Sequence, residues 1–354
     1  SSTIADNSGA VTLVKSGPGT LTLSGSNSYS GGTFINAGTV VITSNSNVGS
    51  AGSTLAFNGS ATLNSGVDTT VVDLARPVVL NNGAVATFGG SSRPNITISG
   101  PVSGSGGVTR AAGSTFWSKV ILSSTANTFT GPIIDLCNGA DAIANSVLSF
   151  NSIFDAPGAG NITLGGASAT GVGVEYGSGA VAPLNLNNRQ IILANNNYNF
   201  FTNRSSQSVN INTDIGFSGT GARLLVLGAS SLNGSGASAF NGRLFDNAGG
   251  ALSVRFEGPW LLTGTNTYSG DTVPQLSTLT IAGRQAVSPN TTFYFDRDTA
   301  SAGNGSSLLR LLINDSGTVS LGNTVKMRQE MSSNAAWTIF VGSNNGGATT
   351  NSTI

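Results

Sequence analysis

Short runs of alternating apolar and polar residues recur along the whole chain, and turns rich in Gly, Asn and Ser separate them. The clearest run lies within residues 17–40, where Leu21 and Leu23 fall on one face and Thr20 and Thr22 on the other. A period of two residues is typical of a β-strand with one buried face. The pattern therefore predicts strand, turn and strand in repetition.

A corner motif, Asn-x-aromatic-x-Gly, recurs between these runs. Its three copies are Asn27, Tyr29 and Gly31; Asn127, Phe129 and Gly131; and Asn266, Tyr268 and Gly270, with a degraded fourth copy around Phe240. A second marker, an Arg leading into an aliphatic strand and an Asn pair, occurs at Arg76 and Arg189. Asn27 and Asn127 are 100 residues apart and Arg76 and Arg189 are 113 apart, and the last part of the chain forms a longer unit. This spacing predicts about three long units, near 1–105, 106–218 and 219–354, each holding several smaller strand-turn repeats.

Short strands with regular turns are compatible with a sandwich, a barrel, a propeller or a solenoid. The repeated corner and the irregular spacing of its strands favour an all-β, right-handed parallel β-helix, or β-solenoid. Inward side chains would then stack in aliphatic columns, and Asn side chains would cap the turns. In the C-terminal part we expect strands at residues 293–295, 308–313, 318–321, 324–327 and 337–341. Residues 140–150 fit a short helix and a strand with a turn equally well.

The composition narrows the functions that this fold could serve. Charged residues make up 8% of the chain, against roughly 25% in an average soluble domain. The 15 basic and 15 acidic residues balance, which argues against a nucleic-acid partner. There is no His, and the single Cys137, set among apolar residues, is expected to be a buried thiol. No apolar run approaches the ~18 residues of a membrane-spanning helix.

The stretch GPGTLTLSGSNSYSGGTFINAGT at residues 17–39 resembles the autotransporter-associated β-strand repeat of bacterial type V passenger regions. Residues 258–272 match the same pattern, and residues 120–131 match it in part. The resemblance implies a structural role for Gly17, Gly19, Leu21, Leu23 and the three corner motifs. It also implies an extracellular or cell-surface location. Because the pattern is already running at Ser1 and still running at Ile354, we expect a processed chain or an excerpt of a longer one.

Candidate chemistry is sparse. Asp296 and Asp298 could begin a calcium site, although a solvated turn explains them as well. The pairs Asp68 with Asp73 and Asp135 with Asp141 could be read as catalytic carboxylates, but scattered surface charges are the simpler interpretation. Tyr29, Phe129 and Tyr268 could stack on sugars or plug structural corners. We expect Arg76 and Arg189 to donate hydrogen bonds to corner carbonyls.

These observations predict a structural protein that acts in adhesion or as a fibre subunit, with no enzymatic activity and no cofactor. We expect it to associate with itself end to end or laterally, because the outermost strands of a rod are open edges. Surface glycans are a further possible partner. The alternatives are a carbohydrate-binding adhesin and a polysaccharide-degrading β-helix enzyme.

Overall fold

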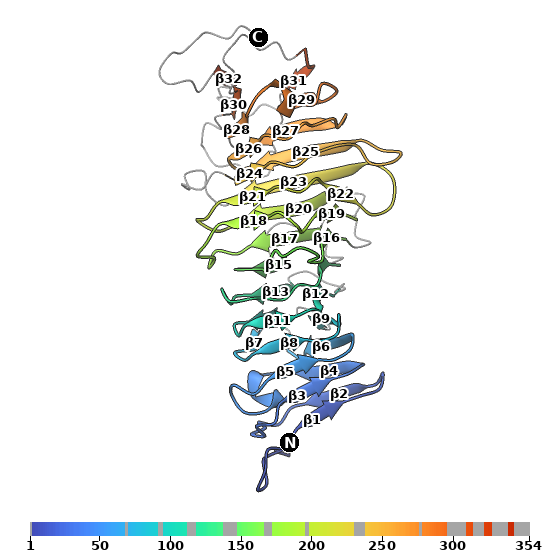
Figure 1. The fold of residues 1–354 in the computed structure, drawn as a ribbon, viewed down its shortest axis with the longest axis vertical. Coiled ribbons are helices and arrows are strands. Elements are labelled where there is room, and N and C mark those ends of the chain that lie inside the picture. The colour runs from blue at the N-terminus through green and yellow to red at the C-terminus, as the bar shows by residue number, and fades with distance from the viewer. Residues whose placement is uncertain are drawn as a thin grey trace.

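Parallel strands stack one above another along the long axis of the protein, as the computed structural model shows (Figure 1). The structure describes residues 2–67, 70–90, 95–111, 118–136, 147–165, 172–194, 198–229, 238–275, 278–295, 309–313, 322–327 and 339–342. Four long sheets run along the rod, and the strands within each are paired in parallel. The predicted parallel β-solenoid is therefore confirmed.

Two of the sheets begin near the N-terminal end. Sheet A contains β1 (Leu13–Lys15), β3 (Thr33–Ile35), β5 (Leu55–Phe57), β8 (Val78–Leu80) and β11 (Val102–Gly104). Sheet B contains β2 (Thr20–Leu23), β4 (Thr39–Ile42), β6 (Ala61–Ser65), β9 (Val85–Gly90), β12 (Gly107–Arg110), β14 (Ile133–Asp135), β16 (Ile162–Leu164), β19 (Ile191–Leu193) and β22 (Gly216–Phe217).

The other two sheets extend to the C-terminal end. Sheet C contains β7 (Val72–Asp73), β10 (Asn95–Ile98), β13 (Lys119–Leu122), β15 (Val147–Phe150), β17 (Val172–Tyr176), β20 (Tyr198–Asn203), β23 (Arg223–Ala229), β25 (Leu252–Glu257), β27 (Asp271–Gln275), β29 (Thr292–Phe295) and β31 (Val325–Met327). Sheet D contains β18 (Leu184–Leu186), β21 (Val209–Ile211), β24 (Ser238–Phe240), β26 (Trp260–Leu262), β28 (Thr278–Ile281), β30 (Leu309–Ile313) and β32 (Ile339–Gly342).

The order of the strands along the chain gives each coil three sides. From β8 to β13 the chain passes through strands of sheets A, B and C in turn. In later coils the strand that follows sheet C belongs to sheet D instead of sheet A. Sheets A and D therefore lie on one side, which we call the A/D side. Near the N-terminus the strands come from sheets A and B, and near the C-terminus from sheets C and D. Short 3-10 turns at Asn45–Val48 (η1) and Arg284–Ala286 (η2) take the place of a strand.

Asparagine ladders mark the end of the strands on the A/D side. The Nδ2 of Asn81 donates to Asn58 Oδ1 at 2.8 Å, and Asn58 Nδ2 donates to Asn36 Oδ1 at 3.1 Å. A second ladder continues the pattern on sheet D, from Asn241 to Asn212 at 2.6 Å and from Asn212 to Asn187 at 2.7 Å. Each of these residues directly follows a strand. The asparagines that follow these strands thus bond to one another, because neutral amides can stack at the strand spacing without repulsion.

Aliphatic columns fill the interior, as the alternation predicts. On sheet B, Leu63 pairs with Phe88, and Leu164 pairs with Leu193 further along the same inward column. All four are fully buried. Burying such a side chain stabilises the fold by roughly 1.5–3 kcal/mol. A continuous column of this kind makes each coil depend on its two neighbours.

An ion pair interrupts that column. Arg110 and Asp135 face inward between Phe88 and Leu164, and both are fully buried. Arg110 Nε donates to Asp135 Oδ1 at 2.7 Å and Arg110 NH2 to Oδ2 at 2.8 Å, while the Gly173 N–H donates to Oδ2 at 2.8 Å. The interpretation of Asp135 as a surface charge is therefore wrong. Its charge is tolerated inside because a bidentate partner and a backbone donor satisfy it.

Most of the predicted C-terminal strands are present as β29, β30, β31 and β32, within two residues of the expected bounds where described. The strand expected at residues 318–321 lies outside the described residues. Residues 147–150 form β15, so this part of the ambiguous 140–150 stretch is a strand. Sheet C runs through both boundaries of the three predicted units and sheet B through the first, and that division stays a prediction.

Candidate functional site

Each corner asparagine joins three successive coils. Asn27 Oδ1 accepts the N–H of Ile4 at 2.8 Å from the preceding coil, and Asn27 Nδ2 donates to Asn47 O at 2.6 Å in the following coil. Asn266 makes the same two contacts, with Leu244 N at 2.8 Å and Ala286 O at 2.7 Å. The amide offers a donor and an acceptor in opposite directions, which is why this position suits Asn.

The second corner has the same arrangement. Asn127 Oδ1 accepts the N–H of Val102 at 3.0 Å, and Asn127 Nδ2 donates to Ser152 O at 3.1 Å. The three corners, however, lie on different sides of the coil. The first lies between strands of sheets B and A, the second between sheets C and B, and the third between sheets D and C. In each case the corner takes the place that a strand holds in other coils.

The aromatic residues of the motif plug the corners from inside. Tyr29 and Phe129 are fully buried and Tyr268 is 2% exposed, so these rings cannot stack on a sugar at the surface. The Tyr29 hydroxyl lies 2.6 Å from Thr33 Oγ1, and the Tyr268 hydroxyl lies 2.5 Å from Thr272 Oγ1. Burial raises the pKa of Tyr268 to about 12 and also raises that of Tyr29, which keeps both hydroxyls neutral.

The glycines of the motif lie against the backbone of the preceding coil. A Cβ at Gly31 would approach Val11 O to 2.6 Å, and one at Gly270 would approach Leu252 O to 2.3 Å. At Gly131 it would meet the carbonyl carbon of Gly106 at 2.2 Å. These positions therefore exclude any side chain. By contrast, Gly19 has open space around it.

Phe240 is not a fourth corner. It ends β24 and pairs with Leu262 of β26, so it corresponds to the strand residue that precedes a corner. Its ring is fully buried in the core. The sequence around it imitates the motif because an aromatic residue followed by Asn and Gly also suits the end of a strand.

Two buried arginines donate to turn carbonyls: Arg189 to those of the second corner, as predicted, and Arg76 to those around the η1 turn, which stacks on the first corner. Arg76 NH1 donates to Val48 O at 2.8 Å, and Arg76 NH2 donates to Asn45 O at 2.6 Å and to Gly49 O at 3.2 Å. Arg189 NH2 donates to Phe129 O at 3.0 Å, and NH1 donates to Gly131 O at 2.7 Å. Burial lowers the pKa of Arg189 to about 10, so it stays charged at neutral pH.

The third corner carries Asn323 at the equivalent place. A strand follows each corner, and two further strands stack on it in the next two coils. The upper of these two strands is β8, β19 or β31, and it begins two residues after Arg76, Arg189 or Asn323 respectively. Asn323 Nδ2 donates to Ser288 O at 3.0 Å and to Thr291 O at 2.8 Å. The same corner geometry is thus held by two different donors.

The family described as passenger-associated-transport-repeat matches residues 13–42 and 258–273, which contain the first and third corners. The adhesin BmaC autotransporter of Brucella suis biovar 1 (strain 1330) is 45% identical over 67 residues, which make up 18% of this chain and 2% of that protein. Two segments of the chain therefore match an autotransporter passenger repeat, as the sequence resemblance predicted. It spans a small fraction of the length of this relative. No solved structure matches the chain.

The two matched passenger-like repeats share a feature that the sequence reasoning missed. Asp6 Oδ1 accepts the N–H groups of Val11 at 2.8 Å and Ser30 at 3.0 Å. Asp246 Oδ1 accepts those of Leu252 and Ser269, both at 2.9 Å. Each Asp begins an Asp-Asn-x-Gly turn in the coil before the corner, and this short motif was the available signal.

Hydrogen bonds set the ionisation of these two carboxylates. The Val11 and Ser30 donors lower the pKa of Asp6. Burial would raise the pKa of Asp246, but the bonds from Ser269 and Leu252 outweigh it and hold the pKa below its ordinary value. Both carboxylates therefore serve as anionic acceptors for turn amides.

Several of the few charged side chains of this protein lie on the outer face of sheet C. Arg204 lies 3.3 Å from Glu175, and Arg255 lies 3.8 Å from Glu257 and over the ring of Tyr198 at 5.8 Å. Burial raises the pKa of Glu175 in spite of Arg204. The backbones of the two glutamates are three strand spacings apart through Thr202 and Gly228, or about 14 Å. Glycosidase carboxylates are about 5 to 9.5 Å apart, so this spacing does not favour polysaccharide hydrolysis.

The remaining predicted residues do not assemble a site. Asp73 is exposed on β7, while Asp68, Cys137, Asp141, Asp296 and Asp298 lie outside the described residues. Within the described part of the chain, no group of three or more His, Cys, Asp or Glu side chains is placed to hold a metal ion. No helix among the described residues has the length and hydropathy needed to cross a bilayer.

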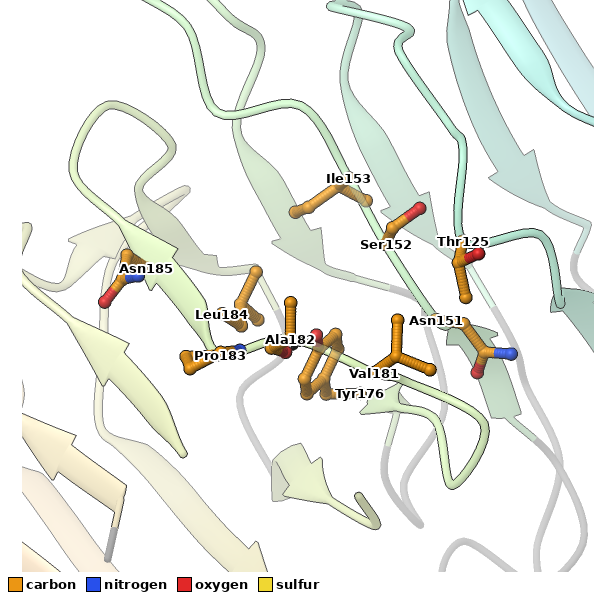
Figure 2. A pocket seen from close by; sticks show the side chains of 10 residues that line it. All are labelled: Thr125, Asn151, Ser152, Ile153, Tyr176, Val181, Ala182, Pro183, Leu184 and Asn185. Carbon is orange, nitrogen blue, oxygen red and sulfur yellow. Dashed lines mark hydrogen bonds between the residues drawn. The ribbon is translucent and has the colours of Figure 1, made fainter. Parts of the chain in front are cut away.

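A cavity of about 250 Å³ lies where the chain passes from β17 to β18 (Figure 2). One wall comes from the loop after β15, the other from the loop that precedes β18, and Thr125 closes one end. Its lining residues are Thr125, Asn151, Ser152, Ile153, Tyr176, Val181, Ala182, Pro183, Leu184 and Asn185. No sequence signal marks it, because its walls come from loops of different coils.

Proposed function

We propose that the chain is an elongated, non-enzymatic scaffold on a bacterial surface that carries adhesive surfaces and associates with itself. The family match and the adhesin relative support a surface adhesin-like role. The observation that carries the proposal is the run of sheet C, which links eleven strands by parallel pairing. Such a stack forms a stiff rod, because each described coil packs directly on its neighbours.

Open strand edges support end-to-end association. In the described residues, β2 pairs only with β4 and β31 only with β29, so each leaves one edge without a strand partner. An unpaired edge offers a row of N–H and C=O groups to another strand. We propose that continuing polypeptide or another copy of the chain pairs with these edges.

A ridge of β-branched side chains supports lateral association. The successive partners on sheet B are Thr20, Thr39, Thr62, Thr87, Thr109, Ile134, Thr163 and Ile192, of which Thr109 is buried and the others reach the surface. Their stiff χ1 angles make the ridge rigid, which lowers the entropy cost of docking. Because a second copy has the same strand spacing, two such ridges can remain in register along their length.

Negative-stain electron microscopy of the untagged protein tests the proposal. We expect filaments or bundles of rods at micromolar concentration. Thr20→Lys with Thr22→Lys should abolish end-to-end filaments, because edge lysines block strand addition. Thr163→Lys lies within the sheet B ridge, away from the edge strand β2, and should remove only lateral bundles. Isolated rods at every concentration, with the wild-type chain, would refute self-association.

A further inference from the structure

The cavity between the loops after β15 and before β18 has the chemistry of a sugar site. None of its lining residues is charged. One part of the wall is apolar, formed by Ile153, Val181 and Pro183, and the other carries the hydroxyl and amide groups of Thr125, Asn151 and Asn185. Val181 is 71% exposed, which is high for an aliphatic side chain outside an interface.

Hydrogen-bonding capacity is left over in this cavity. Asn185 Oδ1 accepts from Asn210 Nδ2 at 2.8 Å, whereas its own Nδ2 has no partner among the described residues. The Thr125 hydroxyl likewise has none in the described part of the chain. Asn151 Nδ2 donates to Ser123 O at 2.7 Å, which leaves Asn151 Oδ1 as an acceptor. A neutral ligand with several hydroxyl groups can use all three.

The loops that form the walls are fixed before any ligand arrives. The buried Tyr176 hydroxyl donates to Ala182 O at 2.5 Å and ties the loop before β18 to sheet C. Gly177 and Gly179 let this loop lie against Asn151, since a Cβ at either would come within 2.5 Å of its side-chain amide. Preorganised walls reduce the ordering cost of binding.

We propose that this cavity binds one uncharged sugar unit of a surface glycan. The C–H face of the sugar would pack on Val181 and Pro183, and its hydroxyls would bond to Thr125, Asn151 and Asn185. The absence of charged side chains from the lining disfavours sialic or uronic acids, whose carboxylates would lose water without gaining a cation. The inference rests on the proposed adhesive function and assigns a ligand class to it.

The test is a glycan array with neutral and acidic glycans, followed by calorimetric titration of any hit against the whole chain. Val181→Asp should weaken binding about 10-fold or more, because the bound sugar would desolvate the new carboxylate. Thr125→Val should weaken it by a similar factor, because a buried sugar hydroxyl would lose its hydrogen-bond partner. Val14→Asp is the matched control, because Val14 is 55% exposed on β1, far from the cavity, and should change affinity less than about 2-fold. Binding should also change little between low and high salt, since no ion pair is involved.

Three results would overturn the assignment: no neutral glycan binds, only acidic glycans bind, or Val181→Asp binds as the wild type does. Circular dichroism and melting of each variant show whether it folds. Electron microscopy of the same samples separates this inference from the scaffold proposal. Normal filaments without glycan binding would refute the sugar site alone, and glycan binding by isolated rods would refute self-association alone.

Discussion

The Tyr29 hydroxyl and Thr33 Oγ1 share a buried hydrogen bond of 2.6 Å, and both residues are fully inaccessible to solvent. The third corner keeps the same pair as Tyr268 and Thr272. At the second corner both members change, since Phe129 is followed four residues later by Ile133. Equivalent positions therefore hold a polar pair at the first and third corners and an apolar pair at the second, and none of the three corners combines a polar with an apolar member.

This pairing predicts a coupled effect of mutation. Thr33→Val leaves the Tyr29 hydroxyl buried without a partner and should cost about 1–3 kcal/mol of unfolding free energy. Tyr29→Phe should cost about 1 kcal/mol, because Thr33 Oγ1 still donates to Val48 O at 3.0 Å. The double variant should be more stable than the sum of the two losses implies. Urea unfolding of the four proteins measures the coupling, and simple additivity would contradict the pairing.

Arg76 should be essential to folding of the η1 turn, which stacks on the first corner. Arg76→Met leaves several buried carbonyls without donors and should cost about 3–5 kcal/mol. Arg76→Lys should recover little, because one ammonium cannot reach the positions served by three nitrogens. Arg243→Met is the control: its ion pair with Asp214 is largely exposed, and its loss should cost less than about 1 kcal/mol. Thermal unfolding separates these cases, and equal losses for Arg76 and Arg243 would contradict the anchoring role.

The glycines of the repeat should differ sharply in their tolerance of a methyl group. Gly31→Ala forces a Cβ to within 2.6 Å of the backbone carbonyl of Val11 and should cost several kcal/mol, roughly the scale of overpacking. Gly19→Ala meets nothing within 4 Å and should change stability by less than about 1 kcal/mol. Denaturant midpoints of the two variants decide the matter. A tolerated Gly31→Ala would mean that the coils are not in close contact at this corner.

Acid should destabilise the third corner through Asp246. Its pKa is lowered in the folded chain, so its contribution is present above the unfolded pKa near 3.8 and is lost as pH falls through the lower folded value. Asp246→Asn should therefore lower stability at pH 6 and have less effect near pH 2. Asp73→Asn, which removes an exposed carboxylate, serves as the control. Unfolding free energies between pH 2 and 6 test this, and a constant Asp246→Asn effect over that range would refute the linkage.

Local signals in the sequence were sufficient for the architecture. Alternating residues such as Leu21 and Leu23 specify strands, and Gly31 and Asn27 specify corners, because these requirements are met within a few residues. The contacts of Arg76 were also foreseeable, since a cation beside a turn needs carbonyl acceptors. The proposed division into three long units also rests on short motifs of this kind.

Features that depend on stacking register were not foreseeable. Arg110 and Asp135 are 25 residues apart, and only the pairing of β12 with β14 brings them together in the core. The sequence around Phe240 imitates a corner because an aromatic residue followed by Asn and Gly also suits the end of a strand, and only the pairing of β24 with β26 separates the two cases. The cavity at Val181 also joins loops from different coils, so no contiguous motif encodes it.

The asparagine that joins three coils at each corner has a mechanical consequence. Backbone hydrogen bonds between coils point along the rod, so a pull on its ends loads them directly. At Asn27, Asn127 and Asn266 one side chain adds a hydrogen bond to the junction with the preceding coil and another to the junction with the following coil. Each of these junctions should therefore resist separation more than a junction held by backbone hydrogen bonds alone. The three corners therefore reinforce the contact between coils on three different sides. A rod under shear flow should separate first between coils that lack a corner.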